Sequence, residues 1–257
     1  MKRTKIQPDI EKIPQRFHKL IEGAEVYDSS CSPEAKVIYI DRDEGYFLKQ
    51  SKKGMLAKEA LLDDYFNKKG FTAPVVDYLS LESDWLLTKR VQGEDATFAL
   101  YLDDPRRLAT SSAEILRTLH ESDFADCPVK TRMDDYFHTV DENYKRGGYD
   151  LSYSIFGTPE EAYRITLEGR HLLKNDTLIH GDYCLPNFLM DNWKFSGFID
   201  LGNGGVGDRH VDLFWGAWTL NFNLHTDKYR DLFFDAYGRD KIDMDAIVVV
   251  SAAEVFG

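Results

Sequence analysis

The chain has 257 residues, of which 43% are apolar and 30% are charged, and its formal net charge at pH 7 is −12. This length allows one large domain or two lobes, and the apolar fraction is sufficient for a packed core. No apolar run approaches the length of a membrane span, and residues 1–8 lack the apolar stretch of a secretory signal. We therefore expect a cytoplasmic protein without a membrane partner.

The acidic charge is concentrated in the second part of the chain. Residues 1–90 contain 16 Lys and Arg and 15 Asp and Glu, whereas residues 91–257 contain 16 and 29. An acidic surface repels nucleic acid and attracts polycations, so we expect no nucleic-acid partner. Acidic surfaces are equally common for solubility, and composition alone leaves the two explanations open. The expected oligomeric state is a monomer or a weak dimer.

The cysteines are odd in number and widely spaced. Cys31, Cys127 and Cys184 form no C-x-x-C motif and have no matching His pair, so the sequence supports neither a disulfide framework nor a zinc site. We predict free thiols. For Cys184, a small apolar filler beneath a loop is favoured over a nucleophile.

The first ninety residues combine short helical pieces with alternating strands. Residues 5–21 have helical apolar spacing that Pro8 and Pro14 restrict to short pieces, which we expect to cover the edge of a sheet. Residues 36–40 and 45–49 alternate around a turn-rich segment, which is typical of a β-hairpin. Further strands at 75–79 and 85–88 complete an expected antiparallel sheet of about five strands.

Lys49 ends the second strand of the hairpin, and Glu59 follows in segment 54–66, which has helical spacing. In kinases a strand lysine contacts the α- and β-phosphates of ATP and pairs with a helix glutamate. The strand-then-helix order therefore predicts a Lys49–Glu59 pair. A solvated basic cluster of Lys49 with Lys52 and Lys53 is the alternative.

Beyond residue 94 the apolar spacing becomes helical. The expected helices are 109–122, 133–144, 160–173, 209–222, 227–237 and 243–256. Residues 89–93 are polar, end in Gly and precede the acidic part of the chain, which favours a hinge. We expect an α+β fold with an N-terminal lobe at 1–89, a hinge at 90–93 and a helical lobe at 94–257, together forming one catalytic unit.

Two motifs in the helical part indicate phosphoryl transfer: HGDYCLPN at 180–187 and SGFIDLG at 196–202. Magnesium prefers hard oxygen ligands, and Asn187 and Asp200 are candidates for them. Asp182 is then the candidate base that accepts a hydroxyl proton, as in the catalytic loop of protein kinases.

These two motifs, in this order and spacing, resemble the aminoglycoside phosphotransferase family, specifically its 3'-hydroxyl (kanamycin kinase) branch. The resemblance implies a two-lobed protein-kinase-like fold, with an antiparallel-sheet lobe and a larger helical lobe. It also implies ATP-dependent phosphorylation of an aminoglycoside hydroxyl, with the 3' hydroxyl as the favoured position and Mg²⁺ as a cofactor. The implied result is antibiotic resistance. GTP is compatible as well, because Thr88 near the hinge is small.

Two other functions stay open. One is a kinase of another small hydroxylated molecule, such as a macrolide or a choline-like metabolite. The other is an inactive kinase-like binding module, which is disfavoured because every expected catalytic residue is present: Lys49, Glu59, Asp182, Asn187 and Asp200.

On the nucleotide side, the resemblance implies contacts that spacing does not assign. Ser32, in the small polar loop before the hairpin, is a candidate phosphate contact, with an ordinary turn as the alternative. Phe47 shares the strand face of Lys49 and is a candidate stacking partner of adenine. Backbone groups of Arg90 and Val91 are candidate partners of the adenine edge.

Around the catalytic loop, the resemblance implies that Asp212 braces the loop and that His180 is structural; the role of Asp208 stays ambiguous. In the family, carboxylates of the helical lobe and of the chain terminus grip a polycationic sugar. The candidates for this role are Asp150, Glu160, Glu161 and Glu254. Each of them is alternatively a solvated surface acid.

The sequence also departs from the family pattern on the acceptor side. The family usually has Arg directly after the D-x-G motif, and a second Arg with a following acid in the next helix. Asn203, Trp218 and Phe222 stand at these places here. The identity of the acceptor is therefore the part of the function that the motifs define least.

Overall fold

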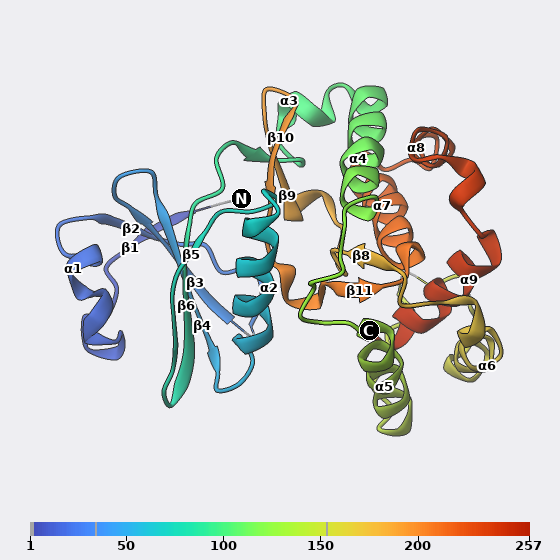
Figure 1. Cartoon of the computed structure of the whole chain (residues 1–257), viewed down its shortest axis with the longest axis horizontal. Coiled ribbons are helices and arrows are strands. Elements are labelled where there is room, and N and C mark those ends of the chain that lie inside the picture. Colours follow the sequence, from blue (N-terminus) through green and yellow to red (C-terminus); the bar gives the residue numbers. More distant parts are fainter. Residues whose placement is uncertain (1–2, 34, 153) are drawn as a thin grey trace. The chain divides into compact units, whose positions relative to one another are not determined.

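A computed structural model describes residues 3–33, 35–152 and 154–257 (Figure 1). The chain divides into two compact units. Unit 1 comprises Met1–Asp95 and Leu189–Gly202, and unit 2 comprises Ala96–Phe188 and Asn203–Gly257. Within the described ranges, no helix has both the length and the apolar character needed to cross a membrane.

Unit 1 is built on a six-stranded antiparallel sheet with the strand order β1-β2-β3-β4-β6-β5. The strands are β1 (Thr4–Ile6), β2 (Glu25–Asp28), β3 (Ala35–Asp41), β4 (Tyr46–Lys52), β5 (Val75–Ser80) and β6 (Ser83–Lys89). The expected hairpin is β3–β4. Because β4 lies between β3 and β6, Lys49 has a paired residue on each side, Val37 and Leu86.

The two faces of this sheet carry separate apolar clusters, because successive residues of a strand point to opposite faces. On one face, Leu87 of β6 belongs to a cluster with Phe17 and Ile21 of the N-terminal segment. On the other face, Leu86 packs with Ala60 of α2 (Ala57–Lys68). Figure 1 shows α2 lying alongside the sheet of unit 1.

The N-terminal segment differs from the expected run of helical pieces. Its first residues form the edge strand β1, in which Ile6 pairs with Val26, so the sheet has one strand more than expected. The helical pieces follow as η1 (Ile10–Lys12), η2 (Gln15–Phe17) and α1 (His18–Ile21). Pro8 precedes the first piece and Pro14 the second, which are positions that the missing N–H and fixed φ of proline allow.

A second, three-stranded sheet joins β7 (Glu94–Asp95), β9 (Phe188–Asp191) and β10 (Lys194–Phe198). Gly93 enters it with φ +93°, and a Cβ there would lie 2.3 Å from the Met190 carbonyl oxygen, so only glycine fits. The expected boundaries put 189–202 in the helical lobe. The structure groups this segment with unit 1 instead, because β9 pairs with β7 and the Phe198 N–H donates to the Phe71 carbonyl.

Unit 2 is mainly helical. Its helices are α3 (Ala99–Leu102), α4 (Pro105–His120), α5 (Arg132–Lys145), α6 (Pro159–Gly169), α7 (Arg209–Leu224), α8 (Arg230–Tyr237) and α9 (Met244–Ala253). The six expected helices correspond to α4–α9. Several begin at side-chain caps that satisfy free backbone N–H groups, such as Asp104 before α4 and Thr158 before α6.

Two short elements in unit 2 frame the catalytic motif. Strand β8 (Thr177–Ile179) pairs antiparallel with β11 (Gly205–Gly207), and the motif follows β8 directly. Within the motif, Tyr183 stacks on Phe188 with ring centroids 5.1 Å apart, and its hydroxyl donates to the Ser112 carbonyl of α4. Figure 1 shows α4 and α7 side by side, and the two helices contact each other.

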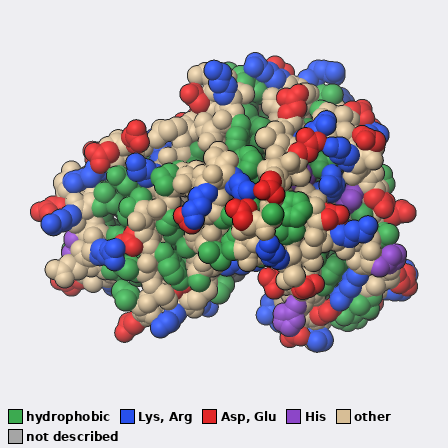
Figure 2. Space-filling model, viewed as in Figure 1, with side chains coloured by type: hydrophobic (Ala, Val, Ile, Leu, Met, Phe, Trp, Pro, Cys, Tyr) green, Lys and Arg blue, Asp and Glu red, His purple; other side chains and the backbone are tan. Residues whose placement is uncertain are grey.

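The charge distribution on the visible surface is mixed. On the face drawn in Figure 2, Lys and Arg side chains lie among Asp and Glu side chains, with apolar side chains between them. The acidic excess of residues 91–257 therefore does not show as one continuous acidic surface in this view.

We expect Gly169→Ala to destabilise unit 2. A Cβ at this position would lie 2.1 Å from Val249 Cγ2 of α9, so either the Val249 side chain or the two helices would have to shift. Overpacking of this kind costs about 1–3 kcal/mol, whereas the better helix propensity of alanine returns only about 0.5–1 kcal/mol. Urea unfolding followed by circular dichroism measures the difference. The exposed neighbour Glu168→Ala is the control, and a Gly169→Ala variant as stable as the wild type would contradict the packing described.

Candidate active site

Three of the residues expected at the nucleotide site meet in unit 1. Lys49 Nζ lies 2.8 Å from both carboxylate oxygens of Glu59 and 2.8 Å from Asp200 Oδ1. The lysine and glutamate side chains are largely buried, whereas Asp200 leaves 54% of its side chain exposed. The predicted Lys49–Glu59 pair is therefore present, and Lys49 is not part of a solvated basic cluster.

The two carboxylates decide the charge state of the lysine. Burial by itself lowers the pKa of Lys49, but the neighbouring charges of Glu59 and Asp200 outweigh this effect and raise the pKa above its usual value. Burial raises the pKa of Glu59, and Lys49 opposes that rise. Lys49 is thus held as a cation at neutral pH, with Asp200 as its exposed partner. Such a cation is suited to bind phosphate oxygens.

Asp200 is held in an unusual backbone conformation, with φ +62°, two residues after the end of β10. Asp tolerates the left-handed region better than most residues, and such conformations concentrate at functional sites. One carboxylate oxygen accepts from Lys49 while the side chain stays more than half exposed. A hard, exposed carboxylate of this kind fits the ligand chemistry of magnesium.

A cavity of about 240 Å³ in unit 1 contains two of the expected adenine contacts, Phe47 and Val91. Its remaining lining residues are Arg3, Gly93, Glu94, Asp95, Leu189 and Ile199. Arg90 does not line it: its backbone N–H donates to the Gly45 carbonyl, which leaves only its carbonyl for a ligand. Ser32 lies exposed in the loop between β2 and β3 and does not line the cavity either.

Arg3 is a lining residue that the sequence did not reveal. Its guanidinium lies 4.0 Å from the ring centroid of Tyr39 and 5.4 Å from that of Phe47. Such contacts are cation–π interactions. An isolated basic residue near the start of the chain carries no spacing signal that links it to an aromatic pair on β3 and β4.

In unit 2, Asp182 and Asn187 are directly connected. The Asn187 side-chain amide donates to Asp182 Oδ2 at 2.8 Å and to the Asp182 carbonyl at 2.9 Å. Because its nitrogen faces Asp182, the carbonyl oxygen of the Asn187 side chain points the other way. This oxygen is a hard donor, so the geometry of Asn187 also fits a magnesium ligand.

Asp212 of α7 makes the contacts expected of a residue that braces this loop. It is fully buried and accepts from the backbone N–H groups of His180 and Gly181, each at 2.7 Å. Gly181 has φ +84°, and a Cβ there would lie 1.9 Å from the Asn203 carbonyl oxygen. His180 is also buried, and its Nδ1 accepts from the Asp182 N–H at 3.3 Å, which ties the ring to the backbone of the loop.

His120 completes the support of the loop and was not foreseen. Its Nε2 lies 3.0 Å from Asp212 Oδ2 and its Nδ1 lies 2.8 Å from the Tyr237 hydroxyl. Burial lowers the pKa of His120, so the ring is neutral, donating to Asp212 and accepting from Tyr237. A single histidine at the end of a helix gave no motif by which this network could be found.

The contacts of Cys184 and Asp208 indicate what each of these two residues does near the catalytic loop. Burial and the nearby Asp182 raise the pKa of the Cys184 thiol, so it stays protonated and is unsuited to act as a nucleophile. Asp208 caps α7: its Oδ1 accepts from the His210 N–H at 2.9 Å and its Oδ2 accepts from the Lys174 N–H at 2.7 Å.

Glu254, one of the candidate acceptor carboxylates, has an unusual electrostatic environment. Its Oε1 accepts from the Tyr136 hydroxyl at 2.8 Å. Burial raises the pKa of Glu254 to about 7, and the charge of Asp182 adds to the rise. Glu254 therefore changes its charge near neutral pH, and its pKa depends on the charge of Asp182 in the catalytic loop.

The other three candidates differ from one another. The Asp150 N–H donates to the Val255 carbonyl at 2.8 Å, which brings this exposed acid to the C-terminal segment. The Glu161 carboxylate accepts from the Gly157 N–H at 3.0 Å and serves the start of α6. Glu160 is exposed on the first turn of α6.

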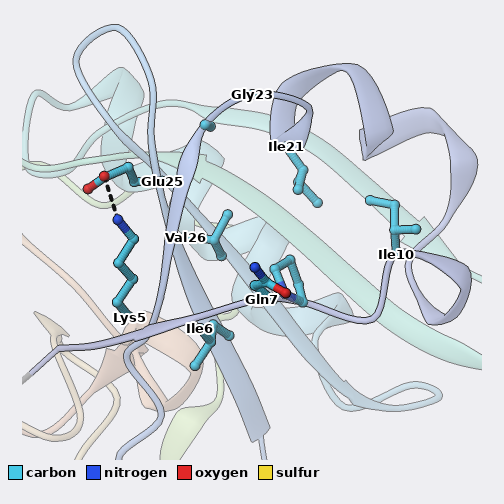
Figure 3. Close-up of a pocket in the computed structure, with 10 residues that line it drawn as sticks. Lys5, Ile6, Gln7, Ile10, Ile21, Gly23, Glu25 and Val26 are labelled. Carbon is cyan, nitrogen blue, oxygen red and sulfur yellow. Dashed lines mark hydrogen bonds and ion pairs between the residues drawn. The ribbon is translucent and has the colours of Figure 1, made fainter.

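A further pocket in unit 1, of about 330 Å³, lies along β1 and β2 (Figure 3). Its lining is mainly apolar and includes Ile6, Ile21 and Val26. Figure 3 shows Lys5 on β1 paired with Glu25 on the neighbouring strand. The distance between Lys5 Nζ and Glu25 Oε1 is 2.5 Å. None of the expected site residues lines this pocket.

Comparison with known proteins gives a consistent result. The model of a family described as "Phosphotransferase enzyme family" matches residues 31–247. A "Probable aminoglycoside 3'-phosphotransferase" of Lactococcus lactis subsp. lactis is 51% identical over 254 residues, which is 97% of this chain and 97% of the relative.

Solved structures with a similar fold include the crystal structure of aminoglycoside-3'-phosphotransferase of type VIII. It has a TM-score of 0.73 at 23% identity, over 91% of this chain and 94% of that one. Aminoglycoside phosphotransferase APH(3'')-Id from Streptomyces rimosus, in complex with ADP and streptomycin, also has a TM-score of 0.73, at 20% identity over 86% and 90%. These likenesses confirm the expected fold.

We expect Asp212→Asn to loosen the loop that carries Asp182. The substituted amide offers one acceptor oxygen where the carboxylate accepts three hydrogen bonds. A buried donor left without a partner costs about 1–3 kcal/mol. Amide hydrogen exchange at His180 and Gly181 should become faster and the midpoint of urea unfolding should fall. The exposed Asp227→Asn is the control; unchanged exchange in Asp212→Asn would show that Asp212 does not hold the loop.

Proposed function

The chain belongs to the phosphotransferase enzyme family, and from this premise we propose that it transfers the γ-phosphoryl group of ATP to a hydroxyl of an aminoglycoside. The 3' hydroxyl is the proposed acceptor, with antibiotic resistance as the consequence. The observation that carries this proposal is the 51% identity over nearly the whole chain to a probable aminoglycoside 3'-phosphotransferase. The proposal includes a cytoplasmic location and a monomeric or weakly dimeric state.

Unit 1 has the groups that a nucleotide requires. In the proposal, Lys49 holds the α- and β-phosphates while Glu59 keeps it in place, which the 2.8 Å contacts support. Phe47 and Val91 line a cavity in which the base is proposed to bind. ATP is the proposed donor and GTP stays possible. Ser32 and the carbonyl of Arg90 are proposed as additional contacts.

Magnesium is part of this proposal because Asn187 and Asp200 fit it. Each offers a hard oxygen, and each is oriented by a second residue, Asp182 and Lys49 respectively. Magnesium, when bound, neutralises charge on the phosphate oxygens during transfer. Asn187 also keeps the Asp182 carboxylate aimed, since its amide donates to one of the two carboxylate oxygens.

Asp182 is proposed as the base of the reaction. It would accept the proton of the acceptor hydroxyl as that oxygen forms a bond to the γ-phosphorus. The bond between the γ-phosphorus and the β–γ bridging oxygen then breaks, and the electron pair leaves with ADP. Asp212 holds the loop that carries Asp182 by accepting a hydrogen bond from the Gly181 N–H, and Gly181 adopts the left-handed conformation that the loop needs.

The acceptor is proposed to bind through carboxylates of unit 2. Glu254, near Asp182, is the first of them, and Asp150 is the second because it contacts the same C-terminal segment. Glu160 is exposed and keeps this role in the proposal, whereas Glu161 is already engaged by the Gly157 N–H. These acids would attract the ammonium groups of an aminoglycoside.

A kinase of another small hydroxylated molecule is the second candidate. The aromatic residues Trp218 and Phe222, at positions where the family pattern has Arg and an acid, favour it. Coupled phosphorylation assays with kanamycin, neomycin, a macrolide and choline separate the candidates. Turnover with the macrolide or choline and with neither aminoglycoside would overturn the first proposal.

We expect Asp182→Asn to lower kcat by about 10²–10⁴-fold, the usual contribution of a general base. The substitution keeps the shape of the side chain, so nucleotide binding, measured by calorimetry, should stay nearly unchanged. Asp227→Asn, an exposed aspartate of the same unit, is the control for the loss of a carboxylate. Loss of nucleotide binding together with turnover would argue against the role of Asp182 as base.

Glu254→Gln is expected to change the pH dependence of acceptor use. Because its folded-state pKa lies at about 7 rather than 4.5, Glu254 is neutral below neutrality and attracts a cation only as the pH rises through about 7. The kcat/KM for kanamycin should therefore gain an ascending limb in this range that Glu254→Gln lacks. Kanamycin titrates equally in both assays, so the ratio of wild type to variant isolates the glutamate. A ratio that is constant between pH 6 and 8 would contradict this role.

A further inference from the structure

One face of α7 carries a row of aromatic side chains. Trp215, Trp218 and Phe222 are spaced three and four residues apart, so they lie along one side of the helix. The Trp218 and Phe222 rings are stacked, with centroids 5.0 Å apart and planes at 13°, and Trp215 meets Trp218 edge-on at 5.4 Å. We call Trp218 and Phe222 the aromatic pair.

The same helix face touches the loop that carries Asp182. Thr219, next to Trp218, accepts from the Leu185 N–H of the loop at 3.2 Å. The Cys184 thiol interacts with both Thr219 and Asp182. Two successive contacts, from Asp182 to Cys184 and from Cys184 to Thr219, thus lead to the residue beside Trp218, and both lie within unit 2.

The other end of the row touches the candidate acceptor acid. The indole N–H of Trp215 donates to Glu254, which also accepts from Tyr136. Trp215 therefore contacts both Trp218 of the aromatic pair and Glu254, the carboxylate proposed to attract the acceptor. The aromatic pair is an extension of that site.

The stretch of α7 that carries the aromatic pair is uncharged, and one ring of the pair is accessible. Phe222 is 50% exposed, and Trp218 is partly exposed beside it. Residues 213–224 of α7 contain no charged side chain. Asn223 turns its amide back to the carbonyl and hydroxyl of Thr219, at 2.8 and 3.1 Å. No ammonium group can find a counter-charge on this stretch of α7.

Resting on the proposed function, we propose that Trp218 and Phe222 are the residues on which a second ring of the acceptor stacks. The aromatic pair favours an acceptor whose second ring has an apolar C–H face. The number of ammonium groups on that ring does not increase its affinity for this surface. An aromatic face attracts a single cation or a polarised C–H edge, but it cannot neutralise several charges as a carboxylate does. The acceptor class that follows is a glycoside of two or more rings whose second ring carries few amino groups.

The test is steady-state kinetics of the full chain with ATP and kanamycin. Trp218→Ala and Phe222→Ala should each raise the KM for kanamycin about three- to tenfold, as expected for a lost aromatic contact, while kcat and the KM for ATP stay unchanged. Leu167→Ala, another half-exposed apolar residue of unit 2, is the matched control.

Two further variants separate stacking from a general loss of structure. Trp218→Phe keeps an aromatic ring, so its KM should return close to the wild-type value. Phe222→Glu adds a carboxylate, so the KM for neomycin, which has more amino groups than kanamycin, should fall relative to the KM for kanamycin and become more sensitive to salt. An unchanged KM ratio in Phe222→Glu would contradict the proposed selection by an apolar face.

Fluorescence provides a readout that does not depend on turnover. The chain has four tryptophans, and kanamycin added without nucleotide should quench part of their emission. That part should be missing in Trp218→Phe.

The outcomes are distinguishable. If the wild type phosphorylates kanamycin but Trp218→Ala and Phe222→Ala keep its KM, the stacking proposal is wrong and the proposed function stands. If the wild type phosphorylates neither kanamycin nor neomycin, the proposed function is wrong, and the stacking proposal falls with it.

Discussion

The charge cluster of Lys49, Glu59 and Asp200 is the interaction on which the rest of unit 1 depends. A largely buried lysine is costly unless it is paired, and removal of one partner of such a group typically costs several kcal/mol. The central strand β4 and helix α2 supply the lysine and the glutamate, and the segment after β10 supplies the aspartate. The sheet order, the cover by α2 and the return of residues 189–202 to unit 1 are all needed to assemble these three charges. Because Asp200 remains exposed, the same cluster presents a cation and a carboxylate to a ligand.

In unit 2, a small number of residues holds the polar loop that carries Asp182. Asp212 replaces solvent for two consecutive backbone N–H groups, and neutral His120 shares the same carboxylate. The acceptor side combines two contrasting surfaces. Glu254 is a carboxylate whose charge depends on pH near neutrality, and α7 contributes an uncharged aromatic face. The first surface recognises positive charge and the second recognises shape, so together they restrict the acceptor more than either would alone.

Sequence patterns predicted the features that depend on short-range spacing or on a motif. The β3–β4 hairpin, helices α4–α9 and the Lys49–Glu59 pair belong to this group. The patterns failed where a contact joins distant residues without periodicity. His120 contacts Asp212 and Tyr237, which lie 92 and 117 positions further along the chain. Arg3 contacts the rings of Tyr39 and Phe47, which belong to two different strands. The edge strand β1 was missed because apolar residues in a short segment suit both periods. The pKa of Glu254 depends on burial, which spacing does not reveal.

The most direct measurement of the central claim is identification of the product formed from ATP and kanamycin by the wild-type chain. The account predicts one equivalent of ADP for each phosphorylated kanamycin, with phosphorus-31 and proton NMR placing the phosphate on the 3' oxygen. Release of ADP and inorganic phosphate without a phosphorylated sugar, or no consumption of ATP at all, would contradict it.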